Sequence, residues 1–255
     1  MIEIAESLVD AEIKFQYLLE KKFGNKLQNK SIFLKPNMGY PKPSPFTTSV
    51  EMVHMVVNVL SRFKPSEITI GEGSTSETSA IENFQKLKVQ EKLSEFNVSF
   101  VDLNNSKSSS VMLDNGIIHY IPSILKTFDL RISLPVIKFY DDDQGEIFLS
   151  NAIKNFFGVL PKNRYQNKPQ SYKRDALHRD LHASVAEVFQ AVEKFTPFDF
   201  YICDGLEILQ GEAEVGNPIR WDKILLSDNA IEVDLKVLEL LGKPMPRYLK
   251  LITGK

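Results

Sequence analysis

The chain has 255 residues, with 31 Lys and Arg against 33 Asp and Glu, and its formal net charge is −2. This near-neutral balance, without a block of five like charges, excludes the electrostatic footprint of a protein that binds nucleic acid or an anionic membrane. The single cysteine, Cys203, excludes an internal disulfide, a cysteine-ligated iron–sulfur cluster and a cysteine-rich zinc site.

The length suits one large α/β domain, and no linker composition forces a boundary, so we predict a single α/β domain over residues 1–255. No apolar run approaches the roughly 18 residues of a transmembrane helix. The N-terminus carries Glu3, Glu6 and Asp10 where a secretory signal needs positive charge. We therefore expect a soluble, cytoplasmic protein.

Amphipathic stretches alternate along the chain with short β-branched and aromatic runs. An apolar stripe predicts a helix over residues 4–23, ended by Gly24, and a buried strand follows at residues 31–34. A Thr-x-x-Glu capping box at Thr48 predicts a helix over residues 48–63. The first third of the chain thus shows the alternation of a sheet flanked by helices.

The same unit repeats in the next stretch. Residues 67–70 form the next predicted strand, and a Ser-x-x-Glu box at Ser74 predicts a helix over residues 74–96. Residues 97–101 follow as a strand, and residues 114–120 indicate a hairpin or an edge strand. The remaining predicted elements are a strand at 128–134, an exposed loop at 161–173, a helix at 175–195, strands at 198–203 and 224–226, and a helix capped by Asp228 or Asn229 that runs to Leu241. We predict a mostly parallel, twisted sheet with helices on both faces in Rossmann-like layers, with a small antiparallel hairpin insertion.

Polar residues follow the predicted strands directly. They are Lys35-Pro36-Asn37, Gly71-Glu72-Gly73-Ser74, Asp102, residues 135–138 and Asp204-Gly205. The carboxyl ends of parallel strands meet at one edge of a sheet, where open α/β folds bind ligands. Turn geometry and helix caps alone explain Gly71, Ser74 and Asp204. They do not explain a lysine between a buried strand and a proline, so we predict a ligand site at this edge.

The motif Gly71-x-Gly73-x-x-Ser76 invites a dinucleotide interpretation, because a strand precedes it and a predicted helix follows. Ser76 stands where a third Gly or Ala is expected, and Glu72 would repel a diphosphate. A glycine-rich strand–helix turn is the better interpretation.

Two other features concern metals. The acidic run at residues 141–146 resembles the start of a calcium loop but lacks its closing glutamate, so a solvated loop is favoured over a divalent cation site. His178 and His182 are neighbours on the predicted helix 175–195, on or beside its buried stripe. A metal site would need a third ligand that the sequence does not identify. A partly buried His178 is a candidate base or ligand, or else a satisfied core residue.

Together these features predict a site for a small anion, because charged donors make the stronger hydrogen bonds to carboxylate or phosphate. The candidates for ligand binding are Lys35, Asn37, Thr47, Gly73, Ser74, Lys138, Lys154 and Asn155. The candidates for proton transfer are His178, Asp204 and Glu72.

Several of these stretches resemble the domain-of-unknown-function 362 family. The matching pieces include Leu34-Lys35-Pro36-Asn37, Gly71-Glu72-Gly73, Leu134-Pro135-x-x-Lys138, the run Ala152-Ile153-Lys154-Asn155-Phe156-Phe157-Gly158, His178 and Asp204-Gly205. The resemblance implies an α/β fold and a cleft built from these residues, but no reaction. Many relatives carry an appended iron–sulfur module, and we expect none in this chain, which has a single cysteine. Where relatives often show Lys-x-Lys-x-His, this chain has Ile137-Lys138-Phe139-Tyr140-Asp141. A remote likeness to lactate-racemase-type proteins is given little weight.

Two functions remain open at this stage. The first is an enzyme acting on a small anionic metabolite, with a divalent metal as an open question. The second is a non-catalytic accessory module that docks on an iron–sulfur or cofactor-handling partner through an exposed apolar patch of Phe139, Tyr140, Phe156 and Phe157. The sequence also leaves open a homo-oligomer.

Overall fold

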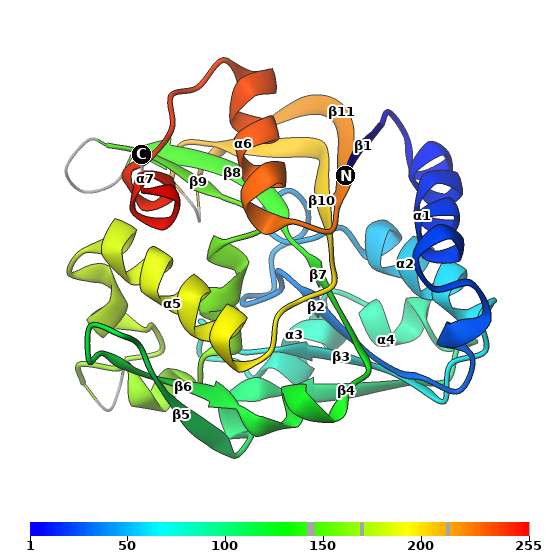
Figure 1. The fold of residues 1–255 in the computed structure, drawn as a ribbon, viewed down its shortest axis with the longest axis horizontal. Helices are drawn as coiled ribbons and strands as arrows, with labels where there is room; N and C mark the ends of the chain where they lie inside the picture. Colours follow the sequence, from blue (N-terminus) through cyan, green and yellow to red (C-terminus); the bar gives the residue numbers. More distant parts are fainter. Residues whose placement is uncertain (142–145, 169–170, 213–214, 255) are drawn as a thin grey trace.

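A long mixed sheet forms the centre of the molecule (Figure 1). The structure, a computed structural model, describes residues 1–141, 146–168, 171–212 and 215–254. Within these residues nine strands join in one sheet, in the order β1-β11-β10-β7-β2-β3-β4, while β8 pairs with β10 and β9 with β8. The strands are β1 (Ile2–Ala5), β2 (Ser31–Pro36), β3 (Glu67–Glu72), β4 (Val98–Asp102), β7 (Leu130–Leu134), β8 (Val136–Asp141), β9 (Ile147–Ser150), β10 (Phe200–Gln210) and β11 (Asn217–Ser227).

The middle of this sheet is parallel. Strands β10, β7, β2, β3 and β4 run parallel to one another, whereas β11 pairs antiparallel with both β10 and β1, and β9 pairs antiparallel with β8. The register sets Lys35 beside Ser133 and Glu72 beside Asp102, so β2, β3 and their neighbours end together. A separate antiparallel pair, β5 (Ser108–Met112) with β6 (Ile118–Pro122), is the predicted hairpin. The predicted fold class is confirmed.

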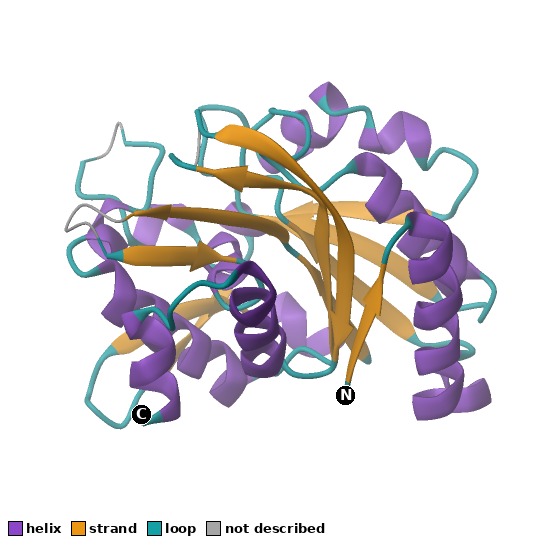
Figure 2. Cartoon of the chain, turned by 90° about the horizontal axis from the view of Figure 1, so that it is seen from above, coloured by secondary structure: helices purple, strands orange, loops and turns teal. Residues whose placement is uncertain are grey.

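Helices cover both faces of the sheet (Figure 2). One face carries α1 (Leu8–Phe23), α2 (Val50–Ser61), α3 (Ala80–Lys86) and α4 (Val89–Lys92); the other carries α5 (Leu181–Phe195), α6 (Ala230–Leu241) and α7 (Arg247–Thr253). Successive side chains of a strand point to opposite faces. In β2, accordingly, Ile32 and Leu34 enter one apolar cluster and Phe33 the other. The buried apolar run of this strand is explained by the two covered faces.

Three predicted helix starts are wrong by a full turn or more, each because a cap lies further along the chain; the start predicted at Thr48 is displaced less, to Val50, with Ser49 as the cap. Residues Ile2–Ala5 form β1, and Ser7 caps α1. The capping box of α3 is formed by Ser79, so residues 74–79 are loop rather than helix. The helix predicted from residue 175 begins at Leu181, after a cap by Asp180.

Other elements were not predicted at all. Strands β8 and β9 lie in a stretch where the sequence indicates only polar residues after a strand, at 135–138, and an acidic loop, at 141–146. Helix α7 lies beyond the last predicted helix. Strand β5 begins at Ser108, inside a Ser-rich segment that indicates a loop by composition. None of the helices in the described residues is long and apolar enough to cross a membrane.

Candidate functional site

A cavity of about 620 Å³ opens beyond the carboxyl ends of β2 and β3. Its lining includes Lys35, Asn37, Glu72, Lys154, Arg174 and His178. These side chains come from strand ends, from the 3₁₀ helix η4 (Lys154–Val159) and from the segment before α5. The position agrees with the rule that open α/β sheets bind ligands at this edge.

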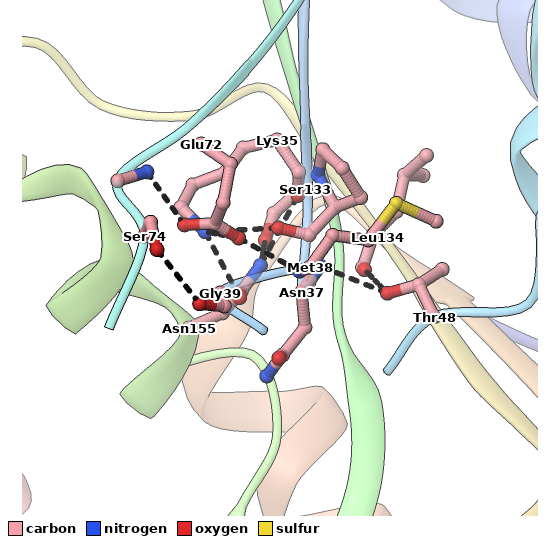
Figure 3. A network of polar contacts seen from close by, with 12 residues as sticks. Lys35, Asn37, Met38, Gly39, Thr48, Glu72, Ser74, Ser133, Leu134 and Asn155 are labelled. Atoms are coloured by element: carbon pink, nitrogen blue, oxygen red, sulfur yellow. Dashed lines mark hydrogen bonds and ion pairs between the residues drawn. The ribbon is translucent and has the colours of Figure 1, made fainter. Parts of the chain in front are cut away.

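A buried ion pair forms the floor of the cavity. The Lys35 Nζ donates to Glu72 Oε2 at 2.9 Å, and the two side chains are 0% and 2% exposed (Figure 3). The ammonium also donates to the Pro36 carbonyl and to Asn155 Oδ1. Burial lowers the pKa of Lys35, and the Glu72 carboxylate opposes that shift. Three acceptors around one nitrogen fit a protonated amine, so Lys35 is an ammonium whose donors are all used.

Glu72 and Asn155 connect this ion pair to three segments of the chain. Glu72 accepts a further hydrogen bond from the Met38 N–H on Oε2 and one from the Gly73 N–H on Oε1. The Asn155 amide donates to the Lys35 carbonyl and to Ser133 Oγ. The Glu72 carboxylate thus accepts hydrogen bonds from Lys35, Met38 and Gly73. Lys35, Glu72 and Asn155 hold the strand ends to η4 (Figure 3).

Gly158 and Gly73 allow the close approach of η4 to the strand ends. A Cβ at Gly158 would collide with Glu72 Oε1 and lie 2.7 Å from the Lys35 Nζ. A Cβ at Gly73 would lie 2.6 Å from both Arg174 Nη2 and the Gly158 carbonyl, which accepts the Gly73 N–H. The glycines are therefore needed for packing around the ion pair, and both also line the cavity.

Gly158→Ala is expected to lower the free energy of unfolding by about 1–3 kcal/mol, the usual cost of forcing a methyl group into a filled site. The clash falls on the Lys35–Glu72 pair, whose charged ends are held in place by hydrogen bonds to the Pro36 carbonyl and the Met38 N–H. Urea unfolding monitored by circular dichroism measures the change. An unfolding midpoint equal to that of the wild type would show that the strand ends and η4 are not tightly packed here.

Arg174 has the most deeply buried side chain of several cavity residues that sequence reasoning missed, among them Arg179 and Ser150. Its side chain is 1% exposed, and the guanidinium donates to the Leu160 carbonyl, the Gly73 carbonyl and Asn104 Oδ1. Burial lowers its pKa to about 10, so it remains charged at neutral pH. Within the described residues its Nη1 is buried without a hydrogen-bond partner, and no carboxylate pairs with it. Arg174 thus places a buried positive charge beside the cavity that has no ion-pair partner in the described residues and is stabilised only at longer range, by Glu72 and Asp102.

Lys154 and Lys138 both line the cavity, in different surroundings. The Lys154 Nζ lies 5.3–5.7 Å from the ring centroids of Phe157, Phe148 and Tyr140. It forms no ion pair with the part of the chain that the structure describes. Lys138 is 3% exposed and donates to the Tyr40 hydroxyl at 2.7 Å and to a backbone carbonyl. Lys154 is therefore the better placed of the two for a ligand anion.

His178 lines the cavity, but not from a helix stripe. It ends the 3₁₀ helix η6 (Asp175–His178), and the residue is exposed rather than partly buried. The Nδ1 lies 3.0 Å from the Arg174 carbonyl, which is only an acceptor, so Nδ1 carries the proton and Nε2 is the basic nitrogen. The ring lies edge-on to Phe157; partial desolvation there and the nearby Lys154 lower the pKa. His178 can therefore accept a proton at neutral pH.

Three candidates lie outside the cavity lining and serve the fold. Thr47 donates to the Lys42 carbonyl, and Ser74 donates to the Gly39 carbonyl. Asp204 is fully buried, and its Oδ2 accepts from the Ser49 N–H at 2.8 Å and the Ser49 hydroxyl at 2.6 Å. Burial raises the pKa of Asp204. It ties β10 to the start of α2, so the structure does not support a role in proton transfer at this cavity.

No group of three or more His, Cys, Asp or Glu side chains that could hold a metal occurs in residues 1–141, 146–168, 171–212 and 215–254. Most of the acidic run interpreted as a calcium-like loop, residues 142–145, lies outside the described residues. His182 is fully buried, and its Nδ1 accepts from the Tyr248 N–H, so it does not join His178.

The apolar patch predicted for docking is not a surface. Phe139, Phe156 and Phe157 are 5%, 0% and 7% exposed and belong to the apolar core, and Tyr140 stacks on Phe148 at 5.3 Å between ring centroids. The run of aromatic residues in the sequence reflects two buried segments, β8 and η4, rather than an interface. The docking hypothesis loses the feature that motivated it.

Fold and cavity define an α/β protein with a ligand-sized cleft at the carboxyl edge of a largely parallel sheet. A family model described as "Domain of unknown function (DUF362)" matches residues 32–239, and the chain belongs to this family. The matched segment contains every residue of the site described above. No curated protein matches the chain.

Two solved structures share the fold. A protein from Thermotoga maritima superposes with a TM-score of 0.51 at 12% identity, over 97% of this chain and 59% of that one. The lactate racemase apoprotein from Thermoanaerobacterium thermosaccharolyticum gives a TM-score of 0.52 at 13% identity, over 94% of this chain and 56% of that one. The chain thus spans less than two thirds of either neighbour, and at these identities the likeness concerns the fold alone.

Proposed function

We propose that the cavity binds a small anionic metabolite through its carboxylate or phosphate group. The observation that carries the proposal is the excess of positively charged residues in the cavity lining. Six Lys and Arg but only three Asp and Glu are among the described lining residues, although the whole chain has a net charge of −2. A local excess of one sign in a concave site attracts ligands of the opposite sign.

The excess charge comes from the loop side of the cavity. On the strand side, Lys35 is neutralised by Glu72. The segment before α5 also contributes Lys173 to the lining. Among the cations of η4 and of this segment, Lys154, Arg174 and Arg179 have no ion-pair partner in the described chain. We name these three residues the loop-side cations. Because Arg174 is buried, it acts through its charge, while Lys154 and Arg179 have donors that can reach a ligand.

Removing one loop-side cation is expected to weaken binding of inorganic phosphate about tenfold, as for one charge-assisted hydrogen bond. Isothermal titration of the purified chain with phosphate and with acetate, comparing wild type and Lys154→Gln, measures this loss. Lys92→Gln on α4 removes an exposed lysine outside the cavity and serves as the control. Equal affinities for all three proteins would refute the proposal.

A second function, proton transfer on the bound anion, is favoured by one observation: His178 lines the cavity with its tautomer fixed by the Arg174 carbonyl. Nε2 is then the base, as a general acid–base catalyst requires. The fold neighbour named as a lactate racemase makes lactate a sensible carboxylate to include among the probes.

Sulfate binding is expected to strengthen as the pH falls below 6.5, because protonation of His178 adds a positive charge to the cavity. Desolvation and Lys154 lower the pKa of His178, so the increase falls below its ordinary value of 6.5 rather than above it. Sulfate does not titrate in this range, and titrations between pH 5 and 8 measure the effect. His178→Gln is expected to flatten the profile; an unchanged profile would exclude His178 from the site.

A further inference from the structure

The cavity is much larger than the anion that its cations would hold. Pockets of about 300–1,000 Å³ enclose drug-sized organic ligands, and this cavity of about 620 Å³ falls within that range. A lone phosphate or acetate would leave most of the volume to water. The size therefore points to a ligand with an organic body beside its acidic group.

The strand side of the cavity has neutral polar groups without partners in the described chain. The side-chain amide of Asn37, which lines the cavity, makes no hydrogen bond there, although its backbone N–H is bound to Thr48 Oγ1. Figure 3 shows this amide pointing away from the Lys35–Glu72 cluster. Ser150 at the end of β9 also lines the cavity, and no hydrogen bond of its hydroxyl is recorded within the described residues.

These groups differ in kind from the loop-side cations. An amide and a hydroxyl each donate and accept, so they suit hydroxyl or carbonyl groups and give no preference for an anion. Their neighbours on the strand side, Lys35 and Glu72, form an ion pair, and the donors of Lys35 are occupied by Glu72, Asn155 and the Pro36 carbonyl. The lining thus offers full positive charge from one set of segments and neutral hydrogen-bonding groups from another.

We propose that the ligand is a two-part organic anion: its carboxylate or phosphate contacts the loop-side cations, and a hydroxylated or carbonyl-bearing body contacts Asn37 and Ser150. This inference rests on the proposed function and names the ligand class for the same cavity. Polar sites of this kind discriminate strongly, since a ligand without the matching group leaves the amide unpaired.

Matched pairs of probes test the body separately from the anion. Inorganic phosphate is compared with glycerol 3-phosphate, and acetate with glycerate, by isothermal titration. In at least one pair, the hydroxylated probe is expected to bind about tenfold more tightly, as for one or two added hydrogen bonds. The pair that shows the larger gain identifies whether the acidic group is a phosphate or a carboxylate.

Two variants then separate the two parts of the ligand. Asn37→Leu, nearly isosteric, is expected to lose most of the gain for the hydroxylated probe and to leave the simple anion within about twofold of wild type. Lys154→Gln is expected to weaken both probes of a pair by the same factor. Ser150→Ala provides a second, smaller substitution on the strand side, and thermal denaturation confirms that each variant is folded.

The outcomes are distinguishable. If both probes of each pair bind equally and Lys154→Gln weakens them, the two-part ligand is wrong and the anion site stands. If Asn37→Leu and Ser150→Ala weaken simple anions as much as hydroxylated ones, the assignment of the strand side is also wrong. If no probe responds to Lys154→Gln, the proposed function fails with it.

Discussion

Glu72→Gln is expected to lower the free energy of unfolding by about 3–5 kcal/mol, the loss typical of breaking a buried ion pair from one side. The Lys35 ammonium is 0% exposed and would keep only a backbone carbonyl and the Asn155 amide oxygen as certain acceptors. The substitution keeps the shape of residue 72, so the loss reports charge rather than a cavity. Urea unfolding at pH 7 measures it.

Removing both charges tests the reason for that loss. Lys35→Met combined with Glu72→Gln leaves no buried unpaired ammonium, so the double variant is expected to recover a large part of the stability lost by Glu72→Gln alone. The exposed pair Lys236–Glu239 on α6 gives the control, and Glu239→Gln there should cost less than about 0.5 kcal/mol. A double variant no more stable than Glu72→Gln would mean that Lys35 also stabilises the fold through its other two hydrogen bonds.

The sequence predicts a ligand site at the carboxyl edge of the sheet because an unusual residue follows a predicted strand. A lysine between a buried strand and a proline has no turn role, and the structure shows Lys35 in the floor of the cavity. Asp204 and Ser74 also follow predicted strands, but they lie outside the cavity lining and form hydrogen bonds with neighbouring backbone and side-chain groups. A residue that caps a helix and a residue that binds a ligand can both stand directly after a strand. Only the contacts in the folded chain distinguish the two roles.

Arg174 could not be predicted for a different reason. It lies in a segment rich in Lys, Asn and Gln, whose composition indicates an exposed loop. Its burial depends on carbonyls of Leu160 and Gly73, which belong to two distant segments that meet only in the folded chain. The prediction put His178 on a helix because the apolar periodicity was extended to residue 175, before the cap at Asp180. Local sequence patterns predict most helices and strands. Contacts between distant segments, such as those that bury Arg174, produce no periodic pattern in the sequence and so could not be predicted.

Asp234→Ala is expected to destabilise the chain by about 3–5 kcal/mol, because it leaves several buried donors without an acceptor. The carboxylate of Asp234, on α6, is 0% exposed and accepts hydrogen bonds from the Asn151 amide, the Ala152 N–H and the Tyr248 hydroxyl. Residues 151 and 152 lead directly into η4, so the loss is also expected to weaken anion binding through Lys154. Glu232→Ala, an exposed acid on the same helix, serves as the control and should change stability by less than about 0.5 kcal/mol.

The pH dependence of that stability separates the charge of Asp234 from its hydrogen bonds. Burial raises its pKa from 3.8 to about 7 in the folded chain, against the pull of its donors. Between pH 4 and 7 the folded chain therefore holds a proton that the unfolded chain releases, so this contribution to stability is complete below pH 4 and is lost as the pH rises to 7. The stability advantage of the wild type over Asp234→Asn should accordingly be larger at pH 5 than at pH 7.5, by up to about 1.4 kcal/mol for each pH unit below 7. An advantage that is equal at both pH values would mean that the donors keep Asp234 ionised, and that its role is to hold the backbone before η4 as a carboxylate.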